Sequence, residues 1–296
     1  MSARGGAADG PGRVALVGPG RLGTLVAHGL AAAGVRLERV AGGSDAARAA
    51  LRSAVAGLRE VPVADVATGM DLVVLAVPDR AVADVVDLLV RSDAVGEGQG
   101  IVHLSGALGL APLRRAALAG AWTAACHPAA TAPAGATDPG LLRGAVWAVT
   151  ASPTGREPAH RLVERLGGDP VDVEEDARPR YHAALAVASN AVGAAVVSAR
   201  RLLAVAGLEQ PDRVLGPLAR ASLEAALRGG AAALTGPVVR GDVATVRSHL
   251  DAIGPDAPEL AAAYRALMRA VLVSVRPALD ADAAAALDAA LSDGEA

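Results

Sequence analysis

The sequence contains no lysine and no phenylalanine, and it has only one cysteine. Without lysine, every basic side chain is an arginine, which excludes any mechanism that needs a lysine as proton donor or Schiff-base nucleophile. Without phenylalanine, and with an aromatic content of 1%, the core must consist of alanine, valine and leucine. The single cysteine, Cys126, excludes an internal disulfide and is typical of the reducing cytoplasm.

Other missing features disfavour whole classes of protein. The net charge of −3 arises from scattered charges of both signs, so no basic stripe for nucleic acid is present. The longest apolar runs, 185–206 and 260–275, are interrupted by Asn190 and by arginines, so neither is predicted to span a membrane. Residues 1–12 lack an apolar stretch and are predicted to be a flexible tail. We therefore expect a cytoplasmic protein that acts on a small-molecule substrate.

The length of 296 residues favours two domains over one. Apolar strands alternate with helices over 13–175, a pattern that predicts a Rossmann-like α/β domain with a mostly parallel sheet. Residues 176–296 show only helical periodicity, which predicts an all-helical domain for substrate binding and dimerisation. Helices near 187–205 and 260–275 carry more apolar residues than one face can bury, so we expect a homodimer, although these faces could instead pack within the domain.

The stretch RVALVGPGRLG, residues 13–23, joins a short apolar strand to a glycine turn and the start of a helix. Gly18 permits a tight turn, Gly20 lets a pyrophosphate approach the backbone, and Gly23 lets the helix pack closely on the strand. The free N–H groups of the following helix favour an anion over the turn. The residues predicted to bind a dinucleotide here are Gly18, Gly20, Arg21, Leu22 and Gly23.

The next strand, 36–41, ends without the acidic residue that usually binds the ribose hydroxyls of NAD. Ser44 and Arg48 follow it and are predicted to hold the 2′-phosphate of NADP(H). Their alternative roles are a helix cap and a solvated charge. Asp45 is a rival ribose ligand, but its place in the first turn of a helix is already explained by the helix dipole.

Polar or small residues follow the later strands of the predicted sheet. Val77, Pro78 and Asp79 end the buried run that begins at Met70, and they should lie under the cofactor. Ser105 follows the strand 100–104. His127 follows the strand 121–125 and is either a site residue or a turn residue held by Pro128.

Two polar clusters interrupt the alanine-rich helical half. His182, Ser189 and Asn190 fall on one stripe if the helix is regular, which predicts a common groove, whereas Asn190 alone could tie helices together. In the second cluster, Thr235 and Arg240 are predicted to bind substrate. Arg240 either meets a substrate carboxylate or pairs with Asp242, a residue placed to cap the next helix.

The motifs VGPGRLG, AVPD, HLSGALG, CHP, YHAALAVASN and LTGPVVRGD, in this order, resemble the Rossmann-like oxidoreductases that carry a DUF2520-type C-terminal domain. In layout this family is similar to pyrroline-5-carboxylate reductases and the 6-phosphogluconate dehydrogenase superfamily. The resemblance implies an NADP site, a helical second domain that often dimerises, and reduction of ketopantoate to pantoate in pantothenate synthesis. Ketopantoate reductases place a catalytic lysine on the first helix of their second domain, and His182 occupies the corresponding part of this chain.

Hydride transfer to a carbonyl needs a proton and stabilisation of the developing oxyanion. His182 is the expected proton donor, because its ordinary pKa lies close to working pH. Asn190 and Ser105 are the other candidate catalytic residues, and Ser189, Thr235, Arg240 and His127 are the candidate substrate ligands. Two alternatives remain at this point: an imine reductase of the pyrroline-5-carboxylate type, and a non-catalytic NADP(H)-binding regulatory protein.

Overall fold

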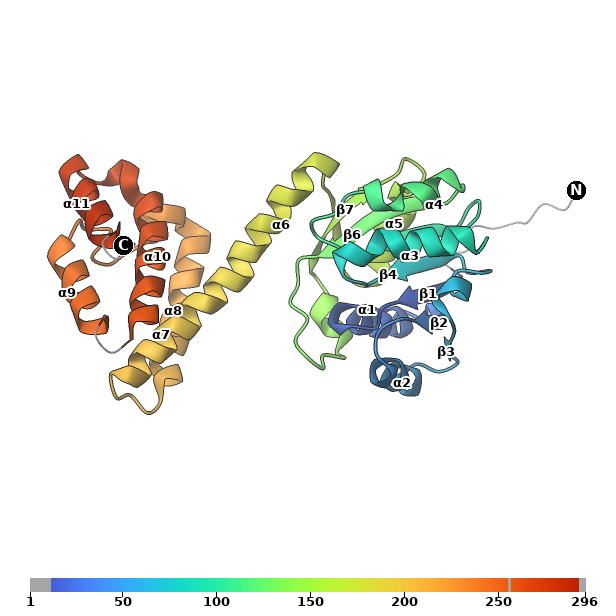
Figure 1. Cartoon of the computed structure of the whole chain (residues 1–296), viewed down its shortest axis with the longest axis horizontal. Helices are drawn as coiled ribbons and strands as arrows, with labels where there is room; N and C mark the ends of the chain where they lie inside the picture. The colour runs from blue at the N-terminus through green and yellow to red at the C-terminus, as the bar shows by residue number, and fades with distance from the viewer. Residues whose placement is uncertain (1–11, 255–256, 293–296) are drawn as a thin grey trace, which may run out of the picture. The chain divides into compact units, whose positions relative to one another are not determined.

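Eight strands form one sheet in the order β3-β2-β1-β4-β5-β6-β7-β8, and neighbours are parallel except β6 and β7 (Figure 1). The computed structural model describes residues 12–254 and 257–292, so nearly all of the predicted tail lies outside the described residues. The strands are β1 (Arg13–Val17), β2 (Arg36–Ala41), β3 (Arg59–Glu60), β4 (Leu72–Leu75), β5 (Gly100–His103), β6 (Trp122–Pro128), β7 (Val146–Ala151) and β8 (Asp169–Asp172). The predicted mostly parallel Rossmann-like sheet is confirmed.

Helices cover both faces of this sheet (Figure 1). They are α1 (Arg21–Ala32), α2 (Asp45–Ala54), α3 (Asp79–Arg91), α4 (Arg114–Leu118) and α5 (Arg156–Arg165), with short 3₁₀ turns η1 (Val63–Asp65), η2 (Ala111–Leu113), η3 (Pro139–Leu142) and η4 (Glu175–Ala177). One apolar cluster contains side chains of α1 and α5, and the other contains side chains of α3 and α4.

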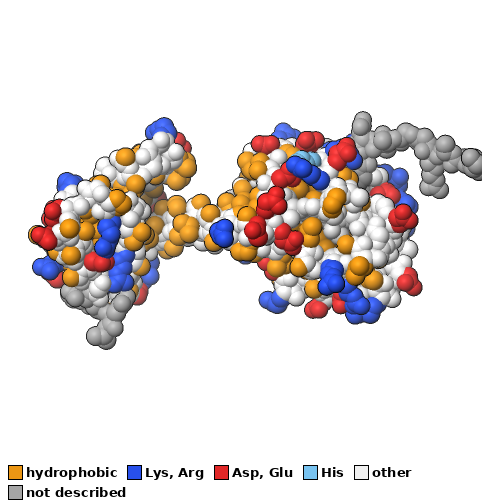
Figure 2. Space-filling view, turned by 90° about the horizontal axis from the view of Figure 1, so that it is seen from above, with side chains coloured by type: hydrophobic (Ala, Val, Ile, Leu, Met, Phe, Trp, Pro, Cys, Tyr) orange, Lys and Arg blue, Asp and Glu red, His pale blue; other side chains and the backbone are white. Residues whose placement is uncertain are grey.

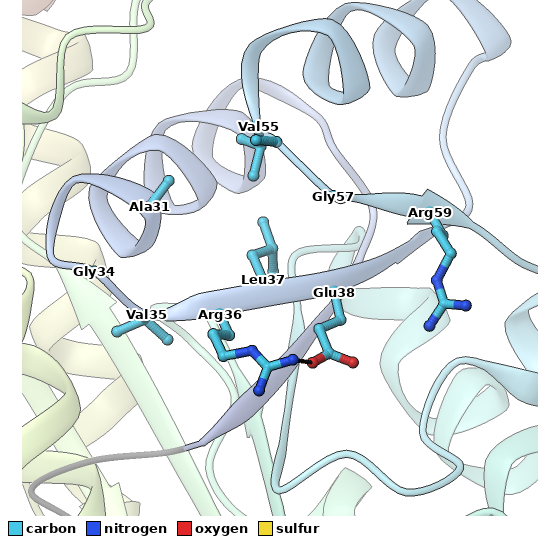
Figure 3. A pocket seen from close by; sticks show the side chains of 10 residues that line it. Ala31, Gly34, Val35, Arg36, Leu37, Glu38, Val55, Gly57 and Arg59 are labelled. Carbon is cyan, nitrogen blue, oxygen red and sulfur yellow. Dashed lines mark ion pairs between the residues drawn. The ribbon is translucent and has the colours of Figure 1, made fainter.

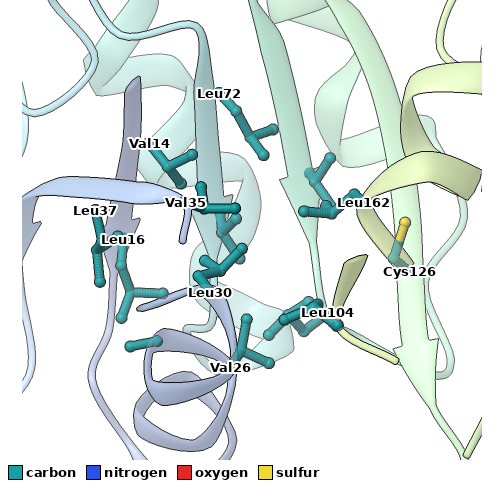
Figure 4. Packing of buried hydrophobic residues seen from close by; sticks show 14 of the residues in the cluster. Val14, Leu16, Val26, Leu30, Val35, Leu37, Leu72, Leu104, Cys126 and Leu162 are labelled. Carbon is teal, nitrogen blue, oxygen red and sulfur yellow. The ribbon is translucent and has the colours of Figure 1, made fainter. Parts of the chain in front are cut away.

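The strand β1 contributes side chains to the apolar clusters on both faces of the sheet. Val14 and Leu16 belong to the cluster under α1 (Figure 4), whereas Ala15 and Val17 belong to the cluster under α3. All four side chains are buried, because a parallel sheet between two helical layers has no solvent-facing side. Valine, leucine and alanine make up most of both layers, but the expected core of these three types alone is incomplete: Trp147 is buried in one cluster, and Met70 and Ile101 in the other.

The strand β6 is longer than the sequence predicts. We expected it to end at Ala125, with His127 beyond it, but the strand continues to Pro128. Antiparallel pairing with β7 extends it, since His127 lies opposite Ala148 and Pro128 opposite Trp147. The interpretation of His127 as a turn residue is therefore wrong: it is a strand residue at the carboxyl end of β6.

The chain divides into two compact units between Ala186 and Val187, which is later than the division expected at 175/176. The helix α6 (Arg178–Ala186) belongs to the first unit because Arg178 is fully buried there. Its guanidinium donates hydrogen bonds to the carbonyl of Ser105 and the hydroxyl of Thr150, both in the sheet domain.

The second unit is helical, and no strand follows Asp172 in the described part of the chain. It contains the π-helix η5 (Val187–Ala191), then α7 (Val192–Val205), α8 (Pro211–Gly229), η6 (Gly230–Ala233), α9 (Val243–Ile253), α10 (Pro258–Val275), η7 (Arg276–Ala278) and α11 (Ala281–Ser292). Its core is formed by side chains of α9, α10 and α11 and by Val238.

The helices α7 and α8 contribute no buried residue to that core. Apolar side chains are instead exposed along them, including Val197, Leu218 and Leu227. Figure 2 shows hydrophobic side chains at the surface of the helical part of the chain. Helical structure runs without interruption over Glu175–Val205, which by length and composition alone is sufficient to cross a membrane. Exposed apolar surfaces of this kind are typical of interaction sites.

Candidate dinucleotide and catalytic site

The three glycines of the turn between β1 and α1 differ in what surrounds them. Gly18 has a φ of 90°, and a Cβ on it would lie 2.7 Å from the carbonyl oxygen of Ala76. A Cβ on Gly23 would lie 2.2 Å from the carbonyl oxygen of Gly18, so α1 packs directly on the turn. A Cβ on Gly20 would meet nothing within 4 Å. The first and third glycines are therefore needed by the fold, whereas the second leaves open space above the turn.

The amino end of α1 is suited to an anion. Its N-cap is Gly20, which offers no side-chain acceptor, and its first turn holds no acidic residue. The first N–H groups of an α-helix have no partner within the helix, so those of Arg21 and Leu22 are available to a ligand. The open space, the free donors and the helix dipole together fit the pyrophosphate of a dinucleotide.

The turn between β2 and α2 brings Ser44 and Arg48 together. The Ser44 hydroxyl caps α2 by accepting a hydrogen bond from the N–H of Ala47. Arg48 donates to the carbonyls of Gly42 and Gly43, at 3.1 and 2.7 Å, and also pairs with two carboxylates. Those carboxylates belong to Glu60, 2.6 Å from Nε, and to Asp45.

The cap on α2 is the alternative role that the sequence predicted for Ser44. Arg48 differs from its predicted alternative, a solvated charge, because its side chain is 15% exposed and braces the turn. In the Arg48–Asp45 pair the Asp45 side chain is 99% exposed and the Arg48 side chain 15%, so only the carboxylate is open to solvent. No acidic side chain follows β2 directly, because Ala41 is succeeded by Gly42, Gly43 and Ser44. The strand end thus lacks the usual ribose ligand of an NAD site.

The segment after β4 lies beside the glycine turn, as predicted from parallel strand ends. The N–H of Ala76 donates to the carbonyl of Val17 at 2.8 Å, and a Cβ on Gly18 would lie 3.0 Å from Cγ1 of Val77. Pro78 is the N-cap of α3, and Asp79 is its first residue. Burial lowers the pKa of His103 and of His127 in the neighbouring strands, and the negative charge of Asp79 opposes part of this lowering.

The loop after β5 is held by its own side chains. The Ser105 Oγ accepts hydrogen bonds from the N–H groups of Ala107 and Leu108, at 3.2 and 3.1 Å, and its O–H proton stays available. His103 is fully buried. Its Nδ1 accepts from the N–H of Ser105, and its Nε2 donates to the carbonyl of Gly109 at 2.9 Å. His103 is therefore a structural residue.

Three aromatic side chains meet at the carboxyl end of β6. The rings of His127 and His182 lie 5.8 Å apart and edge to face, and His127 and Tyr181 adopt the same arrangement. The Nδ1 of His127 is 3.1 Å from the hydroxyl of Tyr181. A Cβ on Gly106 would lie 2.5 Å from Cδ2 of His182 and 3.0 Å from Nε2 of His127. Both predicted histidines therefore border the loop that carries Ser105.

The surroundings of this cluster keep His127 and Tyr181 uncharged beside the exposed His182. Burial, the neighbouring His182 and the cationic Arg178 lower the pKa of His127 to about 4. Burial raises the pKa of Tyr181, so the phenol keeps its proton at neutral pH. Burial also raises the pKa of Cys126 to about 12, which excludes this thiol as a nucleophile. His182 is exposed and is placed to exchange protons with solvent.

The remaining candidates lie in the second unit. Ser189 and Asn190 are exposed within the π-helix η5, and their side chains form no hydrogen bond within the described residues. A π-helix has more residues per turn than an α-helix. The common stripe of His182, Ser189 and Asn190 was predicted for a regular α-helix, so that prediction does not hold here. π-Turns nevertheless occur frequently at functional sites.

Thr235 and Arg240 are exposed before α9. In the described part of the chain, the Arg240 guanidinium forms no hydrogen bond or ion pair, so it does not pair with Asp242. That carboxylate instead caps α9 through the N–H and hydroxyl of Thr245. After the two Thr245 hydrogen bonds, the positive charge of Arg240 also helps to lower the pKa of Asp242, so the two groups are close without forming an ion pair.

A pocket lies elsewhere, at the amino end of β2 (Figure 3). It has a volume of about 500 Å³ and is bordered by the Arg36–Glu38 ion pair and by Arg59. The ligand edge of a parallel sheet is the carboxyl end of its strands, so this pocket is separate from the candidate site.

Two family models match the sequence, a Rossmann-like domain over residues 5–128 and a domain of unknown function, DUF2520, over residues 145–271. The chain therefore contains a Rossmann-like domain followed by a DUF2520 domain. The glycine turn described above is the dinucleotide-binding feature of its Rossmann-like domain. Among curated protein sequences, none matches.

Solved structures share the whole arrangement at low sequence identity. A candidate NADP oxidoreductase from Bacteroides fragilis is 20% identical with a TM-score of 0.76, and the match covers 89% of this chain and 98% of that one. An imine reductase from Streptomyces aurantiacus is 17% identical with a TM-score of 0.65, covering 95% and 100%. A pyrroline carboxylate reductase from Plasmodium falciparum, with NADP bound, is 14% identical with a TM-score of 0.56, covering 95% and 98%. These similarities establish a common fold.

Sequence reasoning missed three residues at this site. Tyr181 received no role, although it is one of two tyrosines in the chain and directly precedes His182. Glu175 and Arg178 also have no predicted role, because the predicted domain boundary falls between residues 175 and 176. No sequence signal marks Arg178 as buried, because an arginine between Ala177 and Pro179 has the pattern of an exposed helix start.

Proposed function

We propose that this protein is an NADP(H)-dependent reductase that transfers a hydride to a small carbonyl compound bearing a carboxylate. The first candidate substrate is 2-dehydropantoate (ketopantoate), reduced to pantoate. The observation that carries the proposal is the shared edge of the sheet: the open glycine turn and the His127–Tyr181–His182 cluster both lie at carboxyl ends of its strands. A nicotinamide bound there supplies the hydride.

The choice of NADP(H) over NAD(H) rests on the turn after β2. No acidic residue is present at this strand end to bind the ribose. Arg48 would bind a 2′-phosphate by exchanging its ion pair with Asp45 for one with the phosphate. Ser44 lies beside it as the cap of α2. The candidate oxidoreductase from Bacteroides and the NADP-bound reductase from Plasmodium share this fold, which agrees with the assignment.

The chain's own residues would supply the proton and the orientation. His182 is the proposed proton donor because it is exposed beside the Ser105 loop and because the chain has no lysine for the task. Ser105 offers a hydroxyl proton to the developing oxyanion. Asn190 is proposed to orient the carbonyl and Arg240 to bind the carboxylate. The supporting observation for both is that their polar groups are unpaired within the described residues.

A second candidate is reduction of a cyclic imine. It is favoured by the fold shared with an imine reductase and a pyrroline carboxylate reductase, and by the uncharged state of His127 and Tyr181. An imine that arrives protonated needs no strong acid from the protein, whereas a carbonyl needs a donor such as His182.

The test is NADPH oxidation by the purified protein over three substrate groups: ketopantoate, other 2-keto acids, and cyclic imines including pyrroline-5-carboxylate. We expect turnover of ketopantoate and its loss in His182→Asn. Turnover of imines alone, with His182→Asn fully active, would replace the first candidate by the second. Binding of NADPH without turnover of any group would contradict both and favour a regulatory role.

A further inference from the structure

Arg178 is a buried cation that lacks a carboxylate partner. Its side chain is fully buried, and no Asp or Glu lies within ion-pair distance among the described residues. Nη2 donates to the carbonyl of Ser105 at 2.6 Å, and Nη1 donates to the Thr150 hydroxyl at 3.0 Å and to the carbonyl of Ala125 at 3.4 Å. Nε has no partner. One guanidinium thus joins the carboxyl ends of β5 and β6 to β7.

Glu175, one helical turn earlier, holds the other end of the same loop. Its Oε1 accepts hydrogen bonds from the N–H groups of Leu110 and Ala111, at 2.7 and 3.2 Å. A Cβ on Gly109 would lie 2.4 Å from this carboxylate, so the loop and Glu175 are in direct contact. The loop 105–111 is therefore fastened at its start by Arg178 and at its end by Glu175.

We propose that Glu175 and Arg178 are positioning residues that clamp the loop 105–111 against His127 and His182. The catalytic part of this inference rests on the proposed function, whereas the structural part does not. The loop meets both imidazoles at Gly106, where an added Cβ would be within 3.0 Å of each. A shift of the loop by about 1 Å would misplace the Ser105 hydroxyl relative to these rings, which is enough to impair catalysis.

The buried charge of Arg178 indicates that it does more than fill space. A buried charge is costly without a charged partner, and an apolar side chain of similar volume would often stabilise such a site better. Arg178 instead places a positive charge behind the His127–Tyr181 pair. After burial and His182, this charge is the next cause that lowers the pKa of His127.

Several other groups bear on His127, and each needs to be kept constant in a test. Tyr181 and His182 face it from α6, Asp79 acts on it from α3, and its neighbour Cys126 stays uncharged. Asp79 opposes Arg178, because its negative charge raises the pKa of His127. A substitution at position 178 leaves all of these side chains in place.

The experiment compares Arg178→Met with Arg180→Met, a matched control at an exposed position of the same helix. Titration of ¹⁵N-labelled histidines by NMR, with His127 assigned from a His127→Gln variant, measures its protonation without substrate. In Arg178→Met we expect His127 to protonate about one pH unit higher, since one like charge nearby is removed. The control should titrate as the wild type does.

Kinetics provide the second readout. Arg178→Met should lower kcat roughly tenfold and move the acid limb of its pH profile upward, with the Kd for NADPH within about twofold of the wild type. If Arg178→Met does not fold, Arg178→Lys tests the same geometry, because its single ammonium keeps the charge but cannot bridge three acceptors.

Glu175 is tested by amide hydrogen exchange. Glu175→Ala should increase exchange at Leu110 and Ala111 at least tenfold relative to Glu175→Gln, whose amide oxygen still accepts both bonds. Unchanged exchange in Glu175→Ala, or unchanged titration and pH profile in a folded Arg178→Met, would overturn the proposal. If only Arg178→Lys folds, an unchanged kcat in that variant would overturn it. A protein that reduces none of the substrates but shows the NMR and exchange effects would contradict only the proposed function.

Discussion

Replacing Gly20 by alanine separates dinucleotide binding from stability. A Cβ at this position meets nothing within 4 Å, and Gly20 has an ordinary φ of −75°, so the free protein accommodates it. The loss of chain entropy in the unfolded state favours alanine, while the N-cap preference favours glycine, and each effect is worth about 0.5–1 kcal/mol. The two nearly cancel, so the free energy of unfolding should change by less than about 1 kcal/mol.

Binding should respond differently, because the methyl group would occupy the space assigned to the pyrophosphate. We expect the Kd for NADPH to rise at least tenfold, a loss of about 1.4 kcal/mol. Two further glycine-to-alanine variants serve as controls for binding and for stability. Gly96→Ala adds a methyl group in open space away from the turn and should alter neither property. Gly23→Ala places a Cβ 2.2 Å from a backbone oxygen and should destabilise the fold by about 1–3 kcal/mol or more.

The assay is isothermal titration with NADPH, together with thermal unfolding of each free protein. An unchanged Kd in a stable Gly20→Ala variant would refute the reasoning, because it would show that no part of the cofactor occupies the space above Gly20. A large loss of stability in Gly20→Ala would refute it as well, since nothing in the fold contacts that position.

Three further predictions concern specificity, catalysis and assembly. Arg48→Ala should raise the Kd for NADPH by roughly tenfold to a hundredfold and leave the Kd for NADH unchanged. An equal rise in both Kd values would show that Arg48 only stabilises its turn. His182→Asn should lower kcat on a 2-keto acid by about a hundredfold to ten-thousandfold at constant Kd for NADPH, and Arg240→Ala should mainly raise KM; wild-type kinetics in both would contradict these roles. Light scattering should show a homodimer in which a second copy covers α7 and α8. Leu218→Glu should therefore yield monomers, whereas the control Leu118→Glu on α4 should remain dimeric. A monomeric wild type at micromolar concentration would refute the prediction.

The sheet and the glycine turn were predictable because each residue there has a local reason for its identity. Val14–Val17 form an apolar run buried on both faces, and the positions of Gly18 and Gly23 forbid a Cβ. Reasons of this kind are visible in a single sequence. The change from strands to helices after Glu175 was visible in the same way, as a change of period.

The catalytic edge was less predictable because long-range contacts determine it. Pairing with β7, more than twenty residues later in the chain, keeps His127 inside a strand. Arg178 became a buried residue through carbonyl groups of Ser105 and Ala125, which no local pattern reveals. The π-turn at Val187–Ala191 altered the phase of the connecting helix, and periodicity arguments assume a constant phase.

The antiparallel pairing of β6 and β7 has a consequence for engineering. A parallel pair needs a crossover that returns the chain to the opposite edge, but the connection between β6 and β7 both leaves and re-enters the sheet at the ligand edge. Its far part is anchored by Leu142, which is fully buried against α1. We expect that residues 133–137, between Ala132 in the apolar cluster and the η3 cap Asp138, can be lengthened, shortened or exchanged without shifting any strand register. This makes the loop the natural place to graft new substrate selectivity onto an unchanged cofactor site.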